Sequence, residues 1–292
     1  MADYEVELLF TSPPMVPKPL VTSHLRVFHI YGTSEKVGKT VMSTHLLNAA
    51  RAFRPNETSS YVKLFSMNRD DKCTHVQEYA PGADNALFHR AKHHYGPVPT
   101  VNDLQKNKVK TDNDIFHEIY KYASCRGSKP GWLFMEMTGG VHSPTPVGTS
   151  QADAFSELNV PVILVGEATT DGVSHTKNAF ESLRVRRYVV AAVMLFRGPR
   201  NSQGHCHINL VSFFRRYCIP VQMVDRPPSR SLISSRDRKN MEAYYGHVVA
   251  NGMAGKVLVV LGNFYSRRAG KGQMSAYPAS SDPSGYSVVT PS

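Results

Sequence analysis

The chain has 292 residues, of which 41% are hydrophobic and 20% charged, so it can bury a substantial core and is not disordered throughout. Its apolar runs are much shorter than the roughly 20 residues that cross a bilayer, so we expect a soluble protein without a membrane partner. The formal net charge of +11 falls in short groups of Lys and Arg that are not interleaved with aromatics. We therefore predict anionic small molecules, and not nucleic acid, as partners.

The N-terminal residues and the cysteines give a first expectation about location. MADYEVELLF lacks the basic region and apolar core of a secretory signal, and also the Arg-rich character of a transit peptide. The four cysteines are scattered without a CxxC pair, which argues against a zinc site and against a disulfide framework. The sequence therefore predicts a cytoplasmic protein with reduced thiols.

The predicted elements alternate between strands and helices along the chain. Residues 25–30 form a β-branched and aromatic run, and residues 41–53 have apolar residues at helical spacing before Pro55. Further strands are predicted at 60–65, 131–135, 160–165, 189–196 and 219–224, and further helices at 112–124 and 174–183. This alternation predicts an α/β fold with a mainly parallel sheet flanked by helices.

Three regions are expected along the chain. Residues 1–24 form a Pro-rich N-terminal lead, and residues 25–262 form the single folded domain. Residues 263–292 are rich in Gly, Ser, Arg and Pro, a composition that is too polar and too rich in helix breakers to add to a core. We predict that this last region is a disordered tail.

A glycine-rich loop joins the first predicted strand to the first predicted helix. It reads GTSEKVGKT, with five residues between its first glycine and Gly-Lys-Thr where the common pattern has four. Backbone N–H groups of such a loop point at phosphate oxygens, Lys39 adds a positive charge, and the Thr40 hydroxyl can bind Mg²⁺. The sequence therefore predicts a fold of the P-loop NTPase type. The predicted nucleotide-binding residues are Gly32, Thr33, Glu35, Lys36, Val37, Gly38, Lys39, Thr40 and Val41.

Two charged residues are predicted near this loop at apolar strands. Glu136 ends the strand of WLFMEMTGG, and ligands of parallel sheets bind beyond the carboxyl ends of the strands. This carboxylate is therefore placed to hold Mg²⁺ directly or through water, with a solvated strand-end carboxylate as the alternative. Lys63 lies within YVKLF, where an unpaired charge is not normally tolerated, so we expect an anionic ligand beside it.

Four segments together resemble the dethiobiotin synthetase family, particularly its eukaryotic form, which is usually fused to a diaminopelargonate aminotransferase. They are GTSEKVGKT, YVK, EMTGGVHSPTPVGTSQAD and NVPVILVGEATTDGVSHTKNAFESL, and the resemblance covers about residues 25–245. It implies an ATP-dependent reaction in which a carbamate made from 7,8-diaminopelargonate and CO₂ is phosphorylated. The neighbouring amine then closes the ureido ring.

The resemblance also implies roles for individual residues. Lys39 and Lys63 would be the catalytic cations, because a carbamate and its acyl phosphate need fixed positive charge where negative charge develops. The implied Mg²⁺ ligands are Thr40, Glu136 and one acid of the pair Asp70 and Asp71, of which we choose Asp71. Lys63, Gly139 and Gly140 would contact the diamine or its carbamate. The family is typically dimeric and its eukaryotic members are often organellar, which implies a homodimer and makes a mitochondrial location the alternative to the cytoplasmic one.

Four positions depart from the family pattern. Lys36 stands where the loop usually has an acidic residue, and Met67 where a hydroxyl residue follows the second lysine. Pro99 lies in a segment that replaces a Ser-Pro-His element, and Phe196 lies where an asparagine that reads adenine is expected. These departures leave open a diverged, non-catalytic ATP-binding homologue. The net charge of +11 leaves open another P-loop ATPase that acts on an acidic metabolite or a nucleic acid. The aminotransferase half is absent from this sequence, so a truncated copy of a bifunctional protein is also considered.

Overall fold

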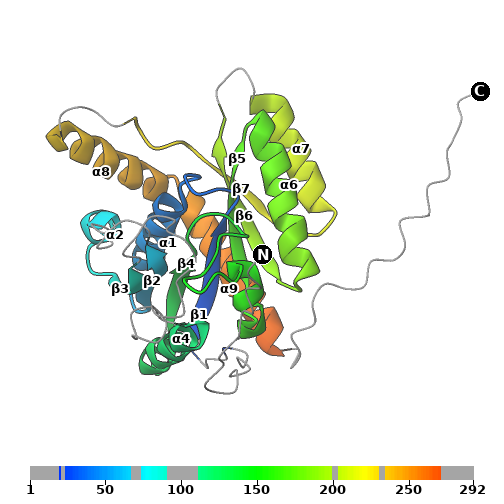
Figure 1. Cartoon of the computed structure of the whole chain (residues 1–292). Helices are drawn as coiled ribbons and strands as arrows, with labels where there is room; N and C mark the ends of the chain where they lie inside the picture. The colour runs from blue at the N-terminus through cyan, green and yellow to red at the C-terminus, as the bar shows by residue number, and fades with distance from the viewer. Residues whose placement is uncertain are drawn as a thin grey trace, which may run out of the picture.

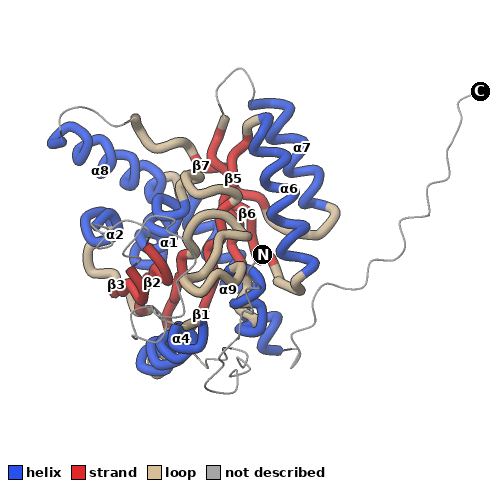
Figure 2. Tube along the Cα trace, viewed as in Figure 1, coloured by secondary structure: helices blue, strands red, loops and turns tan. Residues whose placement is uncertain are grey.

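The structure, a computed structural model, describes residues 20, 24–66, 74–90, 111–198, 203–229 and 234–270. At its centre is a parallel sheet of seven strands in the order β3-β2-β4-β1-β5-β6-β7 (Figures 1 and 2). The strands are β1 (Leu25–Gly32), β2 (Thr58–Ser66), β3 (Asp84–Arg90), β4 (Gly131–Glu136), β5 (Val162–Ala168), β6 (Val190–Arg197) and β7 (Val221–Val224). The predicted α/β fold with a parallel sheet is confirmed.

Helices cover both faces of the sheet, and each face has its own apolar core. The helices are α1 (Lys39–Phe53), α2 (Thr74–Tyr79), α4 (Asp112–Arg126), α5 (Gln151–Ala154), α6 (Thr170–Val185), α7 (Gln203–Arg215), α8 (Ser234–Ala250) and α9 (Met253–Gly270), with a 3₁₀ turn at Ser156–Leu158. One core is built on α1, α2, α8 and α9, and the other on α4, α5, α6 and α7. Figure 1 shows α6 and α7 side by side on the right, with α1, α2 and α8 on the left.

The central strands read as continuous apolar runs because both of their faces are covered. In β1, Phe28 and Ile30 enter the core under α1, whereas Val27 and Tyr31 enter the opposite core. Burial therefore holds this strand in one register, and every strand of the parallel sheet ends at the same edge. The loop after β1 lies at the middle of that edge.

Several elements were not predicted from the sequence. The edge strand β3, DNALFHR, is too polar to be recognised as a strand. Helix α9 corrects the predicted boundary at residue 262, because it continues to Gly270. The hydroxyl of Tyr265 accepts a hydrogen bond from Val27 N at 2.9 Å and donates one to Val27 O at 3.1 Å, so α9 is anchored to β1 beyond the expected end of the domain. The predicted lead, apart from Leu20 and His24, and residues 271–292 lie outside the described residues.

Among the described residues, no single helix is long and apolar enough to cross a membrane. One bent pair, Ser235–Ala250 with Gly255–Ser266, passes that test by length and composition only, and its two halves meet at 57°.

Candidate functional site

The glycine-rich loop connects the end of β1 to the start of α1. Thr33 N donates a hydrogen bond to Val165 O at 2.9 Å, which fixes the start of the loop to β5. Gly38 precedes α1 with φ of 95°, a left-handed conformation that favours glycine. A Cβ at this position would also collide with the ring of Phe196, so the close approach of that ring requires glycine as well. The predicted strand, loop and helix context of a phosphate-binding loop is therefore present.

The remaining loop residues differ in burial. The side chains of Glu35 and Lys36 are exposed, so the lysine that departs from the family pattern faces solvent. Val37 is buried, and Val41 packs against the core under α1. Backbone groups, and not the side chains of Glu35 and Lys36, are therefore the part of this segment that is held in place by the fold.

Lys39 joins the glycine-rich loop to the segment that follows β4. Its ammonium donates hydrogen bonds to Ser34 O at 2.9 Å, to Glu35 O at 3.0 Å and to Gly139 O at 2.6 Å. Burial lowers the pKa of Lys39 to about 8, while Glu136 nearby raises it and Lys63 lowers it further. The sequence placed Lys39 in the phosphate loop, and the structure adds a direct contact with one of the predicted substrate-binding glycines.

Glu136 lies at the end of β4 and its side chain is 2% exposed. Its Oε1 accepts a hydrogen bond from the Thr40 hydroxyl at 2.7 Å. Its Oε2 accepts hydrogen bonds from Ser43 and Tyr61, each at 3.0 Å. The alternative of a solvated strand-end carboxylate is therefore wrong, because the group is buried and bonded to three hydroxyls.

Lys63 reaches the same carboxylate from the neighbouring strand. Lys63 and Glu136 are register partners in the parallel pair of β2 and β4, and Lys63 Nζ lies 3.8 Å from Glu136 Oε1. The charge within an apolar strand thus has an anionic partner inside the protein, where the sequence alone suggested a ligand. Its position still puts a second cation beside the phosphate loop.

Gly139 and Gly140 lie directly against that loop. Gly139 has φ of 69°, and a Cβ at Gly140 would lie 3.6 Å from Thr33 O. Gln151, which the sequence reasoning did not single out, holds the start of this turn by accepting from Thr138 N at 3.2 Å and donating to Thr138 O at 3.0 Å. The Thr138 hydroxyl also donates to Phe65 O on β2. The turn is therefore fixed on both sides.

The oxygen atoms of this site suit Mg²⁺, which prefers oxygen ligands and keeps several waters or phosphate oxygens. Thr40 and Glu136 supply a hydroxyl and a carboxylate that already touch each other. Within the described ranges, no group of three or more His, Cys, Asp or Glu side chains could hold a metal ion. Asp71, the third predicted ligand, lies outside those ranges, as do Met67 and Pro99. The two protein oxygens therefore fit an ion that is held together with a nucleotide.

A second polar cluster lies at the ends of β5, β6 and β7. Arg226 donates to Glu167 Oε2 at 2.8 Å and to Arg197 O at 2.9 Å. Arg197 pairs with Asp225 at 2.8 Å. Phe196, which stands in place of the expected asparagine, is buried against Gly38. Sequence reasoning missed these pairs because nothing local in the chain indicates them.

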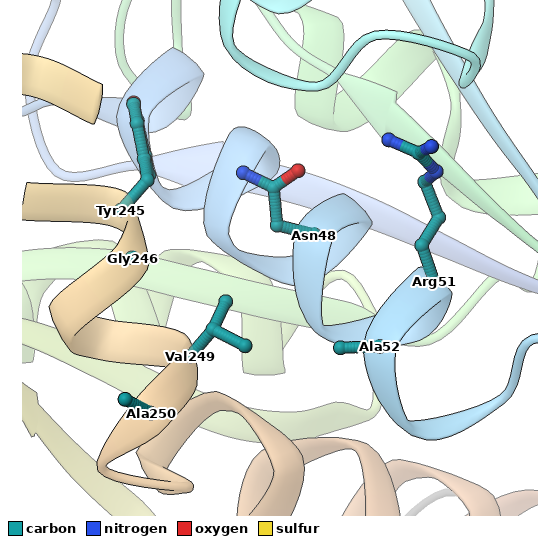
Figure 3. Close-up of a pocket in the computed structure, with 7 residues that line it drawn as sticks. All are labelled: Asn48, Arg51, Ala52, Tyr245, Gly246, Val249 and Ala250. Carbon is teal, nitrogen blue, oxygen red and sulfur yellow. The ribbon is translucent and has the colours of Figure 1, made fainter. Parts of the chain in front are cut away.

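An open groove of about 520 Å³ lies elsewhere (Figure 3). Figure 3 shows Asn48, Arg51 and Ala52 on α1, and Tyr245, Gly246, Val249 and Ala250 on α8, lining this open groove. At 1.5 Å per residue, Asn48 is roughly 14 Å along α1 from Lys39. The groove is therefore separate from the phosphate loop.

Comparisons with known proteins agree with the resemblance. The chain is 32% identical over 232 residues to a bifunctional dethiobiotin synthetase and aminotransferase of Emericella nidulans, a match that covers 77% of this chain and 29% of that protein. It is 38% identical over 98 residues to a mitochondrial bifunctional protein of Oryza sativa, covering 33% of this chain and 11% of that one. An ATP-dependent dethiobiotin synthetase of Neorickettsia sennetsu is 26% identical over 190 residues, a match that covers 57% of this chain and 74% of that protein.

The chain spans less than a third of the length of the bifunctional relative from Emericella nidulans. The predicted resemblance to dethiobiotin synthetases is nevertheless confirmed, because relatives of both the fused and the separate form are matched. Residues 26–224 match a family described as an AAA domain, a span that includes the phosphate loop, Glu136 and the turn after it. Because this match runs from the strand before the phosphate loop to the last residue of β7, the chain belongs to that AAA domain family.

Proposed function

We propose that this protein is an ATP- and Mg²⁺-dependent cyclo-ligase of the dethiobiotin synthetase type, which closes the ureido ring of 7,8-diaminopelargonate with CO₂. The observation that carries the proposal is the second cation. Lys63 Nζ lies 3.8 Å from Glu136 Oε1, and both residues shift the pKa of Lys39, so one site offers two positive charges. A reaction between two anions, a carbamate and ATP, needs such charges.

The chemistry balances without a protein nucleophile. One amine of the substrate attacks CO₂ and loses a proton, which gives a carbamate. A carbamate oxygen takes the γ-phosphoryl group and ADP leaves, after which the second amine attacks the carbonyl carbon, loses a proton and expels inorganic phosphate. In this scheme Lys39 stabilises the charge on the transferred phosphoryl group, and Lys63 holds the carbamate anion.

Backbone and hydroxyl groups complete the proposed site. Thr40 and Glu136 would hold Mg²⁺, which when bound neutralises charge on the phosphate oxygens of ATP. Gly139 and Gly140 would let the substrate approach the backbone closely, since neither carries a side chain beside Lys39. The turn is held by Gln151, so the substrate groups would meet a preorganised surface.

The direct test is product formation. Purified protein is incubated with ATP, Mg²⁺, bicarbonate and the diamine, and dethiobiotin is looked for by mass spectrometry. We expect ADP release only when the diamine and bicarbonate are both present, and product formation about 100- to 1,000-fold slower with Lys39→Ala. Bound ATP without any dethiobiotin would refute the proposal.

A second candidate is a diverged homologue that binds ATP without turnover. Phe196 favours it, because a buried ring now touches the phosphate loop at the position where the family reads adenine. This candidate predicts saturable ATP binding with no ADP released under any combination of substrates. The same incubation separates it from the cyclo-ligase.

The quaternary state and the location are further proposals that rest on the family. We propose a homodimer, which light scattering on the purified chain would test by its mass. For the location, the cytoplasm remains the prediction and the mitochondrion the alternative, which the name of the Oryza sativa relative favours.

A further inference from the structure

Tyr61 was not among the predicted site residues, yet its hydroxyl ends on the carboxylate of the site. It lies on β2 two residues before Lys63, so both side chains leave the strand on the face that α1 covers. Tyr61 is fully buried and donates to Glu136 Oε2 at 3.0 Å. The Ser43 hydroxyl, on the first turns of α1, lies 3.0 Å from the same oxygen and also 3.0 Å from Lys39 O, so its single proton is shared between these two acceptors. Hydroxyl groups from β2 and from α1 therefore both contact Oε2 of Glu136.

The two oxygens of Glu136 have different surroundings as a result. A carboxylate oxygen offers about two lone pairs, and those of Oε2 receive the hydroxyls of Tyr61 and Ser43. Oε1 receives the Thr40 hydroxyl at 2.7 Å and faces Lys63 Nζ at 3.8 Å. Of the two oxygens, Oε1 is therefore the one that contacts Thr40, which lies in the first turn of α1 beside the phosphate loop.

We propose that Tyr61 is a positioning residue of the divalent-cation site: together with Ser43 it holds Glu136 Oε2, so that the carboxylate offers Oε1 alone and the site prefers Mg²⁺ to Ca²⁺. The inference rests on the part of the proposed function that places Mg²⁺ at Thr40 and Glu136. It adds a determinant of which ion is accepted and how the carboxylate is oriented.

The physical basis is the different coordination of the two ions. Mg²⁺ demands near-octahedral geometry and takes carboxylates through one oxygen, whereas Ca²⁺ accepts six to eight oxygens and often both oxygens of a carboxylate. Removing the Tyr61 hydroxyl leaves Oε2 with one donor and frees the carboxylate to turn. Both oxygens can then reach an ion, which favours Ca²⁺ relative to Mg²⁺. Groups that orient a metal ligand typically change metal affinity about 10- to 100-fold when they are removed.

The test measures nucleotide binding by the full chain without a divalent cation, with Mg²⁺ and with Ca²⁺. The dissociation constant of a fluorescent ATP analogue is measured in EDTA, in Mg²⁺ and in Ca²⁺ for the wild type and for Tyr61→Phe. We expect the affinity in EDTA to stay within about twofold, and the gain in affinity from Mg²⁺ to fall about 10-fold. The gain in affinity from Ca²⁺ should fall less, so the ratio of the Mg²⁺ gain to the Ca²⁺ gain decreases.

Tyr188→Phe is the matched control. Tyr188 is also a buried tyrosine, but its hydroxyl donates to Ala152 O at 3.0 Å in the core on the other face of the sheet. Tyr188→Phe therefore also removes a buried tyrosine hydroxyl, but one that makes no contact with Glu136. We expect this variant to keep the ratio of Mg²⁺ to Ca²⁺ gains of the wild type.

Three results would overturn the proposal: an unchanged ratio in Tyr61→Phe, an equal loss of affinity in EDTA, or a wild type whose nucleotide affinity does not respond to Mg²⁺. If Tyr61→Phe does not fold, Ser43→Ala removes the other donor to Oε2, and an unchanged ratio there counts equally against it. No diamine is used, so a protein that shows the metal preference but makes no dethiobiotin would refute ring closure and leave the role of Tyr61 supported.

Discussion

The two halves of the sheet edge use their polar residues in different ways. At the ends of β1, β2 and β4, charges and hydroxyls converge on one buried carboxylate, and Lys39 contacts the backbone on both sides of the site. At the ends of β5, β6 and β7, the charged side chains pair with one another, and three of the four are more than 40% exposed. The polar groups of the first half therefore converge on one buried carboxylate, whereas those of the second half form ion pairs near the surface.

The departures from the family pattern do not follow this division, because Lys36 lies in the phosphate loop of the first half and Phe196 lies on β6 in the second. Gly38, Lys39, Thr40 and Glu136 are nevertheless all present, and hydrogen bonds join Lys39 to Gly139 O and Thr40 to Glu136 Oε1. We infer that the buried, hydrogen-bonded groups of the first half tolerate substitution less well than the exposed ion pairs of the second. Substitutions in the two halves should therefore differ in the size of their effects.

The largest effect is expected from Lys39→Ala. The substitution removes the cation that would stabilise the transferred phosphoryl group, and losing one such group typically costs about 100- to 1,000-fold in rate. The measurement is kcat/KM for ADP release with the diamine and bicarbonate present. Lys177→Ala, which removes a lysine stacked on Phe213 at 5.0 Å on α6 and α7, should keep wild-type activity. An active Lys39→Ala enzyme would show that the phosphate loop is not used.

Glu136→Gln should come next, with a loss of about 100-fold in Mg²⁺-dependent ATP affinity. The amide keeps the shape of the side chain, but one of its two ends no longer accepts hydrogen bonds and Lys63 loses its ion pair. The measurement is ATP binding by calorimetry in Mg²⁺ and in EDTA. Glu181→Gln, an exposed carboxylate on α6, serves as the control. Equal binding by both variants in Mg²⁺ would contradict the placement of the ion.

A graded effect is expected from pH. The pKa of Lys39 lies at about 8, lowered mainly by burial. The protonated form binds phosphate, so below this value affinity is retained, and above it the affinity of the free protein for ATP should fall about tenfold per pH unit. Binding measured from pH 6.5 to 10 tests this, and an affinity that stays flat to pH 10 would show an ordinary lysine. Lys39→Ala should remove the slope.

How far the sequence could predict this site depends on the range of the interactions. The phosphate loop was predicted because its residues are contiguous and its flanking strand and helix carry local patterns. Glu136 and Lys63 were recognised as charges at apolar strands, but their contact depends on the register of β2 and β4, which no local pattern gives. Tyr61 and Ser43 passed unnoticed for the same reason, since a tyrosine in a strand and a serine in a helix are ordinary residues until the fold brings them together.

The smallest effect is expected in the second half of the edge, from Arg226→Ala. Arg226 is 46% exposed, and its ion pair with Glu167 is half in solvent, where such pairs contribute about 0–1 kcal/mol. We expect the free energy of unfolding to change by less than about 1 kcal/mol and the ATP affinity by less than about threefold. Arg238→Ala, which breaks an exposed pair on α8, gives the baseline for such a loss. A 100-fold drop in ATP affinity would contradict the difference between the two halves. It would indicate that Arg226 contacts the base or a phosphate, so that the second half is part of the binding site.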